Sequence, residues 1–252
     1  MNLTRRFRKS TCLVALAGGL LASAAAYADV TAYENDFETN LSGTGSATAT
    51  WTVIGGGTGA INTAPSGQNF LGLDDGSNLG FSNPPVPWKP VALPAYTGFS
   101  LAFDLYAIQT WDGNNFSVGP DLFGVSAKAG NLSLPILVTT FSNWSFYDQS
   151  YSDNFFSSHP AQTGAVAVDS LGYPLAMAGD ATYHITSGWG FGETTGDLTF
   201  TFYGLNLQGN ADESWGIDNL KVTVSAVPEP TSLALFGAGI LVMGVIALRR
   251  RV

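Results

Sequence analysis

Cysteine is nearly absent from this chain of 252 residues: the sequence has one, Cys12, and the segment 29–226 has none. A segment without cysteine forms no disulfide bond and offers neither a thiol nucleophile nor a thiolate ligand. Cysteine-based redox chemistry and cysteine-containing zinc sites are therefore excluded for this segment.

Basic residues are equally scarce in segment 29–226, where they are Lys89, Lys128 and Lys221. The same segment holds 18 acidic residues, so its formal charge is −15. Nucleic-acid binding requires a positive field that neutralises phosphates, and this segment has the opposite sign. The composition excludes nucleic acid as a partner, and the negative field favours the accumulation of divalent cations.

Recognisable catalytic motifs are also missing. The two histidines, His159 and His184, lie far apart, which makes a weak case for a metal site. No G-x-S-x-G, H-E-x-x-H or phosphate-binding glycine motif is present. We interpret both histidines as surface or packing residues and expect a protein that is not an enzyme.

The N-terminus has the pattern of a secretory signal peptide. Arg5, Arg6, Arg8 and Lys9 precede an apolar stretch, and Ala26-Tyr27-Ala28 fits the A-x-A cleavage pattern. We therefore predict a signal peptide at residues 1–28 and cleavage before Asp29.

The C-terminus combines three features in a fixed order: the motif Pro228-Glu229-Pro230, an apolar stretch, and the cluster Arg249, Arg250 and Arg251. The 18 residues from 231 to 248 carry no charge, which is enough for a short membrane-spanning helix. Arginines tend to remain on the cytoplasmic side, so the body of the protein is expected outside.

These C-terminal features, which occupy residues 227–252, resemble the PEP-CTERM domain of Gram-negative bacteria. In that family an exosortase, a membrane cysteine transpeptidase, cuts near the motif during export. The resemblance implies a precursor anchored in the inner membrane and a final location at the cell surface or outside the cell. It also implies an exopolysaccharide setting, because exosortase systems accompany exopolysaccharide production.

The segment 29–226 is predicted to be one all-β domain. Apolar residues alternate with polar ones at 100–108, 198–203 and 220–224, whereas no stretch shows a helical apolar stripe. Glycine- and asparagine-rich turns separate the predicted strands. We predict an antiparallel two-sheet β-sandwich, jelly-roll-like; the closing segment 213–220 is similar to the final strand of jelly-roll, lectin-like domains.

A calcium site is the first candidate for binding chemistry. Glu34, Asp36 and Glu38 are spaced two apart, so on a strand they project to one side. Asp218 lies in the predicted last strand, which is often the neighbour of the first. Calcium prefers oxygen ligands of this kind, and jelly-roll carbohydrate-binding modules, which this body resembles, often hold a structural calcium. The alternative is a solvated acidic edge.

Asp112-Gly113-Asn114 with Asp121 is a second, weaker calcium candidate, because it begins like an EF-hand loop but lacks the later glycine and glutamate. A simple turn is favoured there.

The same acidic strand also suggests an alternative function. Glu34-x-Asp36-x-Glu38 resembles the E-x-D-x-E strand motif of laminarinase-type glycoside hydrolases, in which paired carboxyls act on the glycosidic bond. The position at the start of the domain argues against this hydrolase interpretation.

Tryptophans in loops are the candidates for carbohydrate contact, because an indole face packs against a sugar ring. Trp88 and Trp111 lie in proline- and asparagine-rich segments and are the better candidates for this contact, and packing in the core is the alternative. The sequence thus predicts an exported, non-catalytic module associated with exopolysaccharide.

Overall fold

The computed structural model describes residues 28–45, 49–51, 58–73, 81, 86–90, 93–153, 155–195, 197–227, 237, 239, 240 and 243. Of the predicted signal peptide, only Ala28 is among them. Within the described part of the chain, strands dominate, and the short 3-10 helix η1 (Leu175–Met177) interrupts them once.

The strands form two antiparallel sheets, of seven and five strands. The seven-stranded sheet has the order β3-β4-β12-β6-β10-β9, with β1 also pairing with β12. Its strands are β1 (Ala28–Asn35), β3 (Gly59–Thr63), β4 (Asn69–Leu73), β6 (Tyr96–Gln109), β9 (Ala167–Val168), β10 (Asp180–Thr194) and β12 (Glu213–Ala226). The five-stranded sheet follows the order β2 (Ala49–Trp51), β5 (Val86–Pro90), β11 (Leu198–Leu205), β7 (Leu122–Ala129) and β8 (Leu132–Thr140).

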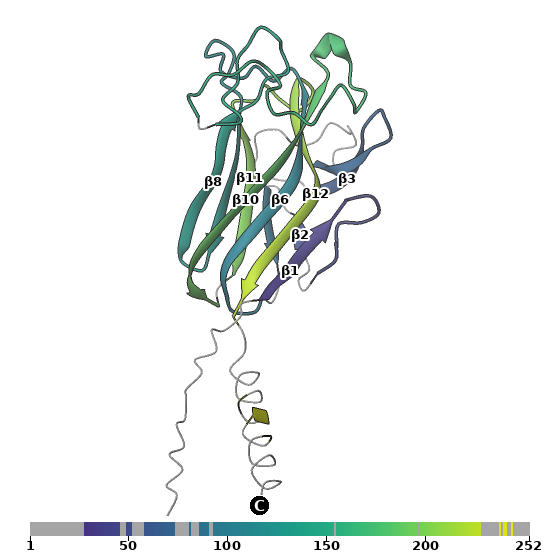
Figure 1. Cartoon of the computed structure of the whole chain (residues 1–252). Coiled ribbons are helices and arrows are strands. Elements are labelled where there is room, and N and C mark those ends of the chain that lie inside the picture. Colours follow the sequence, from purple (N-terminus) through teal and green to yellow (C-terminus); the bar gives the residue numbers. More distant parts are fainter. Residues whose placement is uncertain are drawn as a thin grey trace, which may run out of the picture.

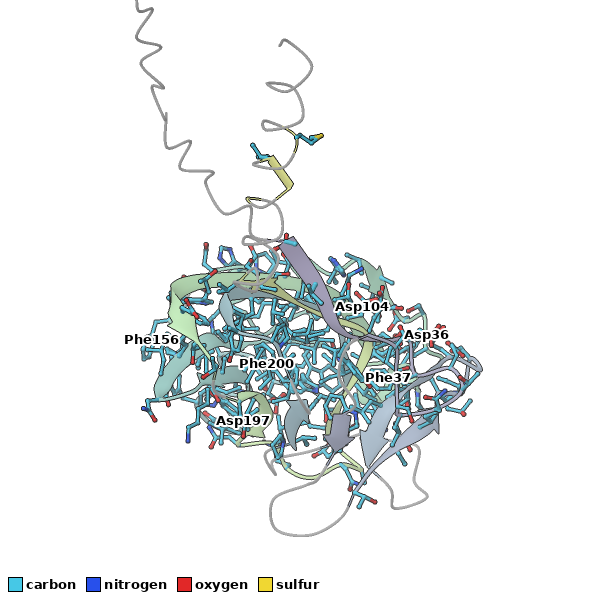
Figure 2. The ribbon with its side chains drawn as sticks, turned by 90° about the horizontal axis from the view of Figure 1, so that it is seen from below. Asp36, Phe37, Asp104, Phe156, Asp197 and Phe200 are labelled. Atoms are coloured by element: carbon cyan, nitrogen blue, oxygen red, sulfur yellow. The ribbon has the colours of Figure 1, made fainter. Side chains whose placement is uncertain are left out.

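The two sheets pack face to face around an aromatic core. Phe103 of β6 contacts Phe202 of β11 edge to face, with ring centroids 5.3 Å apart, and Phe123 of β7 contacts Trp215 of β12 at 5.3 Å. Figure 2 shows Phe200 of β11 in this interior. The alternating residues predicted to face inward on β6 and β11 are buried, so the predicted all-β, two-sheet sandwich is confirmed.

β12 pairs with β6 along one edge and with β1 and β4 along the other. Ala28 pairs with Ala226, so the first and last strands are neighbours, as predicted. The start of β1 and the end of β12 lie at one end of the sandwich, and the long connections 110–121 and 141–179 lie at the other (Figure 1).

Residues 228–236 and most of the remaining C-terminus lie outside the described residues. Gly237, Gly239, Ile240 and Met243, which belong to the predicted membrane helix, are helical. In the described part of the chain, no helix reaches the length and apolarity that a membrane crossing needs.

Candidate functional site

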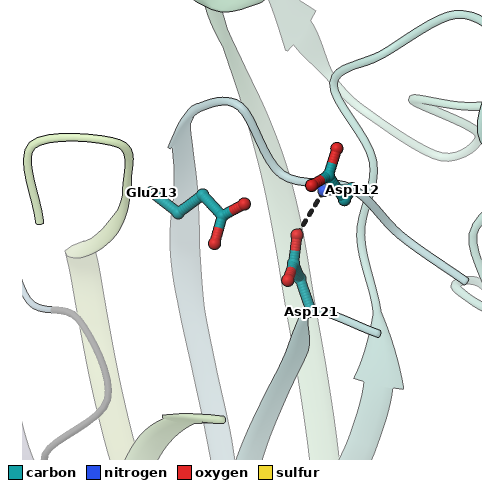
Figure 3. A group of neighbouring side chains, drawn as sticks. All are labelled: Asp112, Asp121 and Glu213. Carbon is teal, nitrogen blue, oxygen red and sulfur yellow. Dashed lines mark hydrogen bonds between the residues drawn. The ribbon is translucent and has the colours of Figure 1, made fainter. Parts of the chain in front are cut away.

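Three buried carboxylates meet at the loop end of the sandwich. They belong to Asp112, Asp121 and Glu213, and one oxygen of each lies within 4.8 Å of the others (Figure 3). Asp121 and Glu213 are fully buried, and Asp112 is 9% exposed. This is the one such group of three acidic, histidine or cysteine side chains within metal-binding reach among the described residues. We call it the carboxylate centre.

Three different segments supply the centre. Asp112 follows the end of β6, Asp121 precedes β7 by one residue, and Glu213 is the first residue of β12. Glu213 is directly opposite Gln109 in the β6–β12 register. The sheet therefore fixes Glu213 beside the chain segment that leads into Asp112.

Tight loop packing holds the two aspartates together. The Asp121 N–H donates to the Gly113 carbonyl at 3.0 Å. Gly113 has φ +60°, a conformation that favours glycine. A Cβ there would lie 2.2 Å from the Asp148 carbonyl oxygen, so the loop has no room for a side chain at this position.

Backbone donors hold one oxygen of each deeply buried carboxylate. The Asp112 N–H donates to Asp121 Oδ2, and the Gln208 N–H donates to Glu213 Oε2 at 2.8 Å. The second oxygens, Asp121 Oδ1 and Glu213 Oε1, are buried and receive no hydrogen bond while both groups are ionised. A proton on either carboxyl would let the two groups hydrogen-bond to each other. The centre thus presents two oriented, unpaired oxygen atoms.

The electrostatic surroundings favour the protonated forms of these acids. Burial raises the pKa of Asp121; the hydrogen bond from the Asp112 N–H opposes this rise, and the negative charge of Asp112 adds to it. Burial and then the charge of Asp121 raise the pKa of Glu213, and burial raises that of Asp112. Without a compensating cation, the three negative charges would repel one another in a poorly hydrated space.

The sequence indicates only part of this centre. Asp112 and Asp121 belong to the weaker calcium candidate, where a simple turn is favoured. The sequence gives no sign of Glu213, because it lies about 100 residues further along the chain and only the β6–β12 register brings it close.

The favoured group of Glu34, Asp36, Glu38 and Asp218 is not assembled as predicted. β1 ends at Asn35, so the strand does not continue through Asp36 to Glu38. The chain turns at Phe37, which has φ 52°. The prediction that the three acidic residues share one side of a strand is therefore wrong.

These acidic residues instead belong to two separate places. Glu34 and Asp36 line a cavity of about 430 Å³, and Glu34 pairs with Lys221 at 3.3 Å. Glu38 lines another cavity, of about 580 Å³, together with Tyr106.

Asp218 contributes to a polar network beside that second cavity. Its Oδ2 accepts hydrogen bonds from the Tyr106 hydroxyl at 2.7 Å and from Gln68 Nε2 at 3.1 Å. Gln68 Nε2 also donates to Glu38 Oε1 at 2.8 Å, which links Asp218 with Glu38 indirectly. Burial raises the pKa of Asp218 to about 6, against the lowering effect of the hydrogen bond from Tyr106.

The two histidines each contact one aspartate. His184 Nδ1 lies 2.7 Å from Asp104 Oδ1 on the solvent side of the seven-stranded sheet, and His159 Nε2 lies 2.9 Å from Asp153 Oδ2. Neither histidine belongs to a metal-binding group among the residues that the structure describes.

The prediction of sugar stacking on Trp111 is wrong. Trp111 is fully buried, and its indole N–H donates to the Ser214 carbonyl at 2.8 Å. The asparagine-rich segment folds back over the core, so the indole face is closed to a ligand. Trp88 lies in β5, opposite Phe200 in register, and its side chain lies outside the described residues.

Other aromatic residues are exposed on the loops at the distal end, the end of the sandwich opposite Ala226. Phe116, Phe146 and Phe156 are 73%, 65% and 79% exposed. Phe146 lies next to Trp144, with ring centroids 5.2 Å apart. Figure 2 shows Phe156 at the periphery of the molecule. The sequence predicts carbohydrate contact at tryptophans and misses these phenylalanines, because exposure depends on how the loops fold.

Comparison with known proteins identifies the C-terminal segment. Residues 226–251 match the PEP-CTERM protein-sorting motif, which confirms the resemblance seen at Pro228-Glu229-Pro230 and the arginine cluster. No curated protein matches the chain at a significant level.

Several solved structures match the chain at low sequence identity and low TM-score. The Stig cyclase Fisc from Fischerella sp. TAU, in complex with an indole compound, is 13% identical (79% of this chain, 86% of that chain, TM-score 0.30). Another cyclase from Fischerella sp. TAU is 14% identical (76% and 80%, TM-score 0.29). The Agl-KA catalytic domain is 16% identical (81% and 28%, TM-score 0.30), so this chain spans about a quarter of that one. Similarity at this level carries no argument about fold or activity.

Proposed function

We propose that this exported, exosortase-sorted protein is a non-catalytic, jelly-roll-like module that binds neutral exopolysaccharide at the cell surface or in the extracellular matrix. The PEP-CTERM motif at residues 226–251 supports export and processing by an exosortase. The polysaccharide part of the proposal rests on the solvent-exposed aromatic residues of the distal loops.

The position of these loops suits binding away from the sorting signal. The aromatic residues at 144–147 and 155–156 lie on connections at the end of the sandwich opposite Ala226, where the matched motif begins (Figure 1). Phe146 also contacts Tyr147, with ring centroids 4.5 Å apart, so the aromatic surface is continuous over neighbouring residues. A polymer can reach this end while the C-terminal end is engaged elsewhere.

The chemistry of the loops favours a neutral glycan as the ligand. Exposed aromatic faces pack against the C–H faces of sugar rings, and neighbouring polar groups bond the hydroxyls. Asp148 and Ser158 lie in the same loops and hydrogen-bond to each other. The charge of −15 on segment 29–226 would repel anionic polymers such as nucleic acid.

Retention on immobilised neutral polysaccharides, with dextran, cellulose and galactan as probes, tests this proposal. The full-length chain, purified in detergent, is expected to be retarded by at least one of them without releasing reducing sugar. The Phe146→Ala/Phe156→Ala double variant should lose most of the retention. Trp189→Ala is the matched control, because Trp189 is 42% exposed on β10, away from these loops.

Equal retention of the double variant and the wild type would overturn the aromatic-surface proposal. Release of sugar would instead support the alternative of a hydrolase that uses Glu34, Asp36 and Glu38. The geometry does not favour that alternative, because Glu34 and Asp36 line one cavity whereas Glu38 lines another.

A further inference from the structure

We propose that the carboxylate centre formed by Asp112, Asp121 and Glu213 is a calcium-binding site that joins the loop end of β6 and β7 to the start of β12. The proposal is independent of polysaccharide binding and of sorting.

The spacing of the oxygens fits one calcium ion. Calcium lies about 2.3–2.6 Å from its oxygen ligands, so two ligands on opposite sides of the ion are about 5 Å apart. One oxygen from each of Asp112, Asp121 and Glu213 lies within 4.8 Å of the other two. A single ion can therefore contact all three carboxylates.

Unpaired buried oxygens are a second observation, separate from the spacing, that indicates a missing ligand. Asp121 Oδ1 and Glu213 Oε1 have no hydrogen-bond partner, although both side chains are fully buried. Such atoms are rare in folded proteins and call for an explanation such as a bound ion. On the adjacent strand, Gln109 Oε1 is also unpaired, and Gln109 is only 7% exposed.

The unpaired oxygens are held in place before any ligand arrives. The Asp112 N–H holds Oδ2 of Asp121, and the Gln208 N–H holds Oε2 of Glu213. Each carboxylate is therefore oriented by one oxygen and keeps the other available. Binding at such a site loses little side-chain entropy, because the ligands are already ordered.

No basic side chain compensates these acids among the described residues. The ion pairs found there involve Asp153, Asp104 and Glu34, none of which belongs to the centre. Burial of several like charges without a cation is unfavourable. A divalent cation would supply the missing positive charge at the point where the carboxylates converge.

The ligand chemistry selects calcium among the common cations. All three ligands are carboxylates, and the centre contains no histidine or cysteine, which zinc prefers. Calcium accepts six to eight oxygens in flexible geometry, so water and backbone carbonyls complete its shell. Asp112 is the least buried of the three ligands and retains some contact with solvent.

Calorimetric titration of the full-length chain, purified in detergent and stripped with EDTA, tests the proposal with calcium chloride as the probe. We expect one saturable site, and a rise in the unfolding midpoint of about 5–10 °C when free calcium is 100-fold above Kd. Asp121→Asn and Glu213→Gln should each remove that site and most of the midpoint shift. Asp36→Asn, which alters an exposed acid outside the centre, should keep both.

The stability of the variants without calcium separates loss of a ligand from failure to fold. In EDTA, Asp121→Asn should be at least as stable as the wild type, because the amide oxygen can still accept the hydrogen bond from the Asp112 N–H and no carboxylate is left buried without a cation at this position. A wild-type protein with no calcium-dependent midpoint shift would overturn the proposal and leave a proton shared between Asp121 and Glu213. Unchanged calcium binding by both variants would overturn it as well.

Discussion

The indole N–H of Trp111 donates a 2.8 Å hydrogen bond to the carbonyl oxygen of Ser214, the residue next to Glu213. This bond connects the segment that carries Asp112 to the strand that carries Glu213. Trp111 also packs edge to face on Phe141, with ring centroids 6.2 Å apart. The residue therefore acts as a spacer between the core and the carboxylate centre.

Replacing Trp111 by phenylalanine should lower the free energy of unfolding by about 2–4 kcal/mol, since it removes a buried hydrogen bond and part of a buried ring. Urea denaturation in EDTA measures this loss. Trp189→Phe, at a partly exposed position, should change stability by less than about 0.5 kcal/mol. A loss no larger for Trp111→Phe than for Trp189→Phe would contradict the spacer role.

Replacing Gly113 by alanine should destabilise the domain strongly. The added Cβ would lie 2.2 Å from the Asp148 carbonyl oxygen, and φ is +60°. We expect the loss to exceed that of Gly67→Ala by about 1–3 kcal/mol, the range for overpacking. Gly67 is a suitable control because φ is +95° and nothing lies within 4 Å of the position that a Cβ would take there. Equal losses for the two variants would show that close packing at Gly113 is unimportant.

The raised pKa of Asp218 predicts that the free energy of unfolding falls as the pH rises from 4 to 7. Burial raises its pKa to about 6 in the folded protein, whereas an unfolded aspartate titrates near 3.9. The folded state thus holds the proton more tightly. The contribution of this proton to stability is complete below about pH 4 and is lost as pH rises through 6, by up to about 3 kcal/mol.

Asp218→Asn should remove that part of the pH dependence, because the amide does not titrate. Urea denaturation at pH 4 and pH 7 in EDTA gives the free-energy change for each protein. The wild type should lose more stability than the variant between the two values. Identical pH dependence in the two proteins would refute a raised pKa at Asp218.

Replacing Arg249, Arg250 and Arg251 with serine should impair processing, since the positive charges orient the apolar segment with respect to the membrane. We expect the unprocessed precursor to become the main form in cell fractions probed by immunoblotting. Lys221→Gln is the control: it removes a positive charge from the body, where the exposed pair with Glu34 contributes little. Normal processing of the triple variant would show that the arginines are dispensable.

The strands were the most predictable part of the protein, because burial alternates along them. Leu101, Phe103 and Leu105 are buried on β6, as their spacing indicated. The sorting signal was also predictable, since its three parts are contiguous in the chain. Both are local properties that a linear sequence displays directly.

The carboxylate centre was only partly predictable, because it depends on contacts between distant segments. Asp112 and Asp121 are nine residues apart and could be noticed together. Glu213 joins them through the pairing of β12 with β6, which the sequence does not specify. The prediction for the acidic motif Glu34 to Glu38 relied on local spacing alone. That spacing fits a strand, but the chain turns at Phe37, so the prediction was wrong.

The position of β12 determines how the protein would respond to a pull on its C-terminus. This strand ends at Ala226, where the sorting motif begins, and it is hydrogen-bonded to β1 on one edge and to β6 on the other. Ladder hydrogen bonds lie perpendicular to the strands. A pull on the C-terminus along β12 therefore shears many bonds together and does not open them one at a time. Resistance to such a force is set by the rate of unfolding, so β12 is well placed to withstand a pull at the C-terminus.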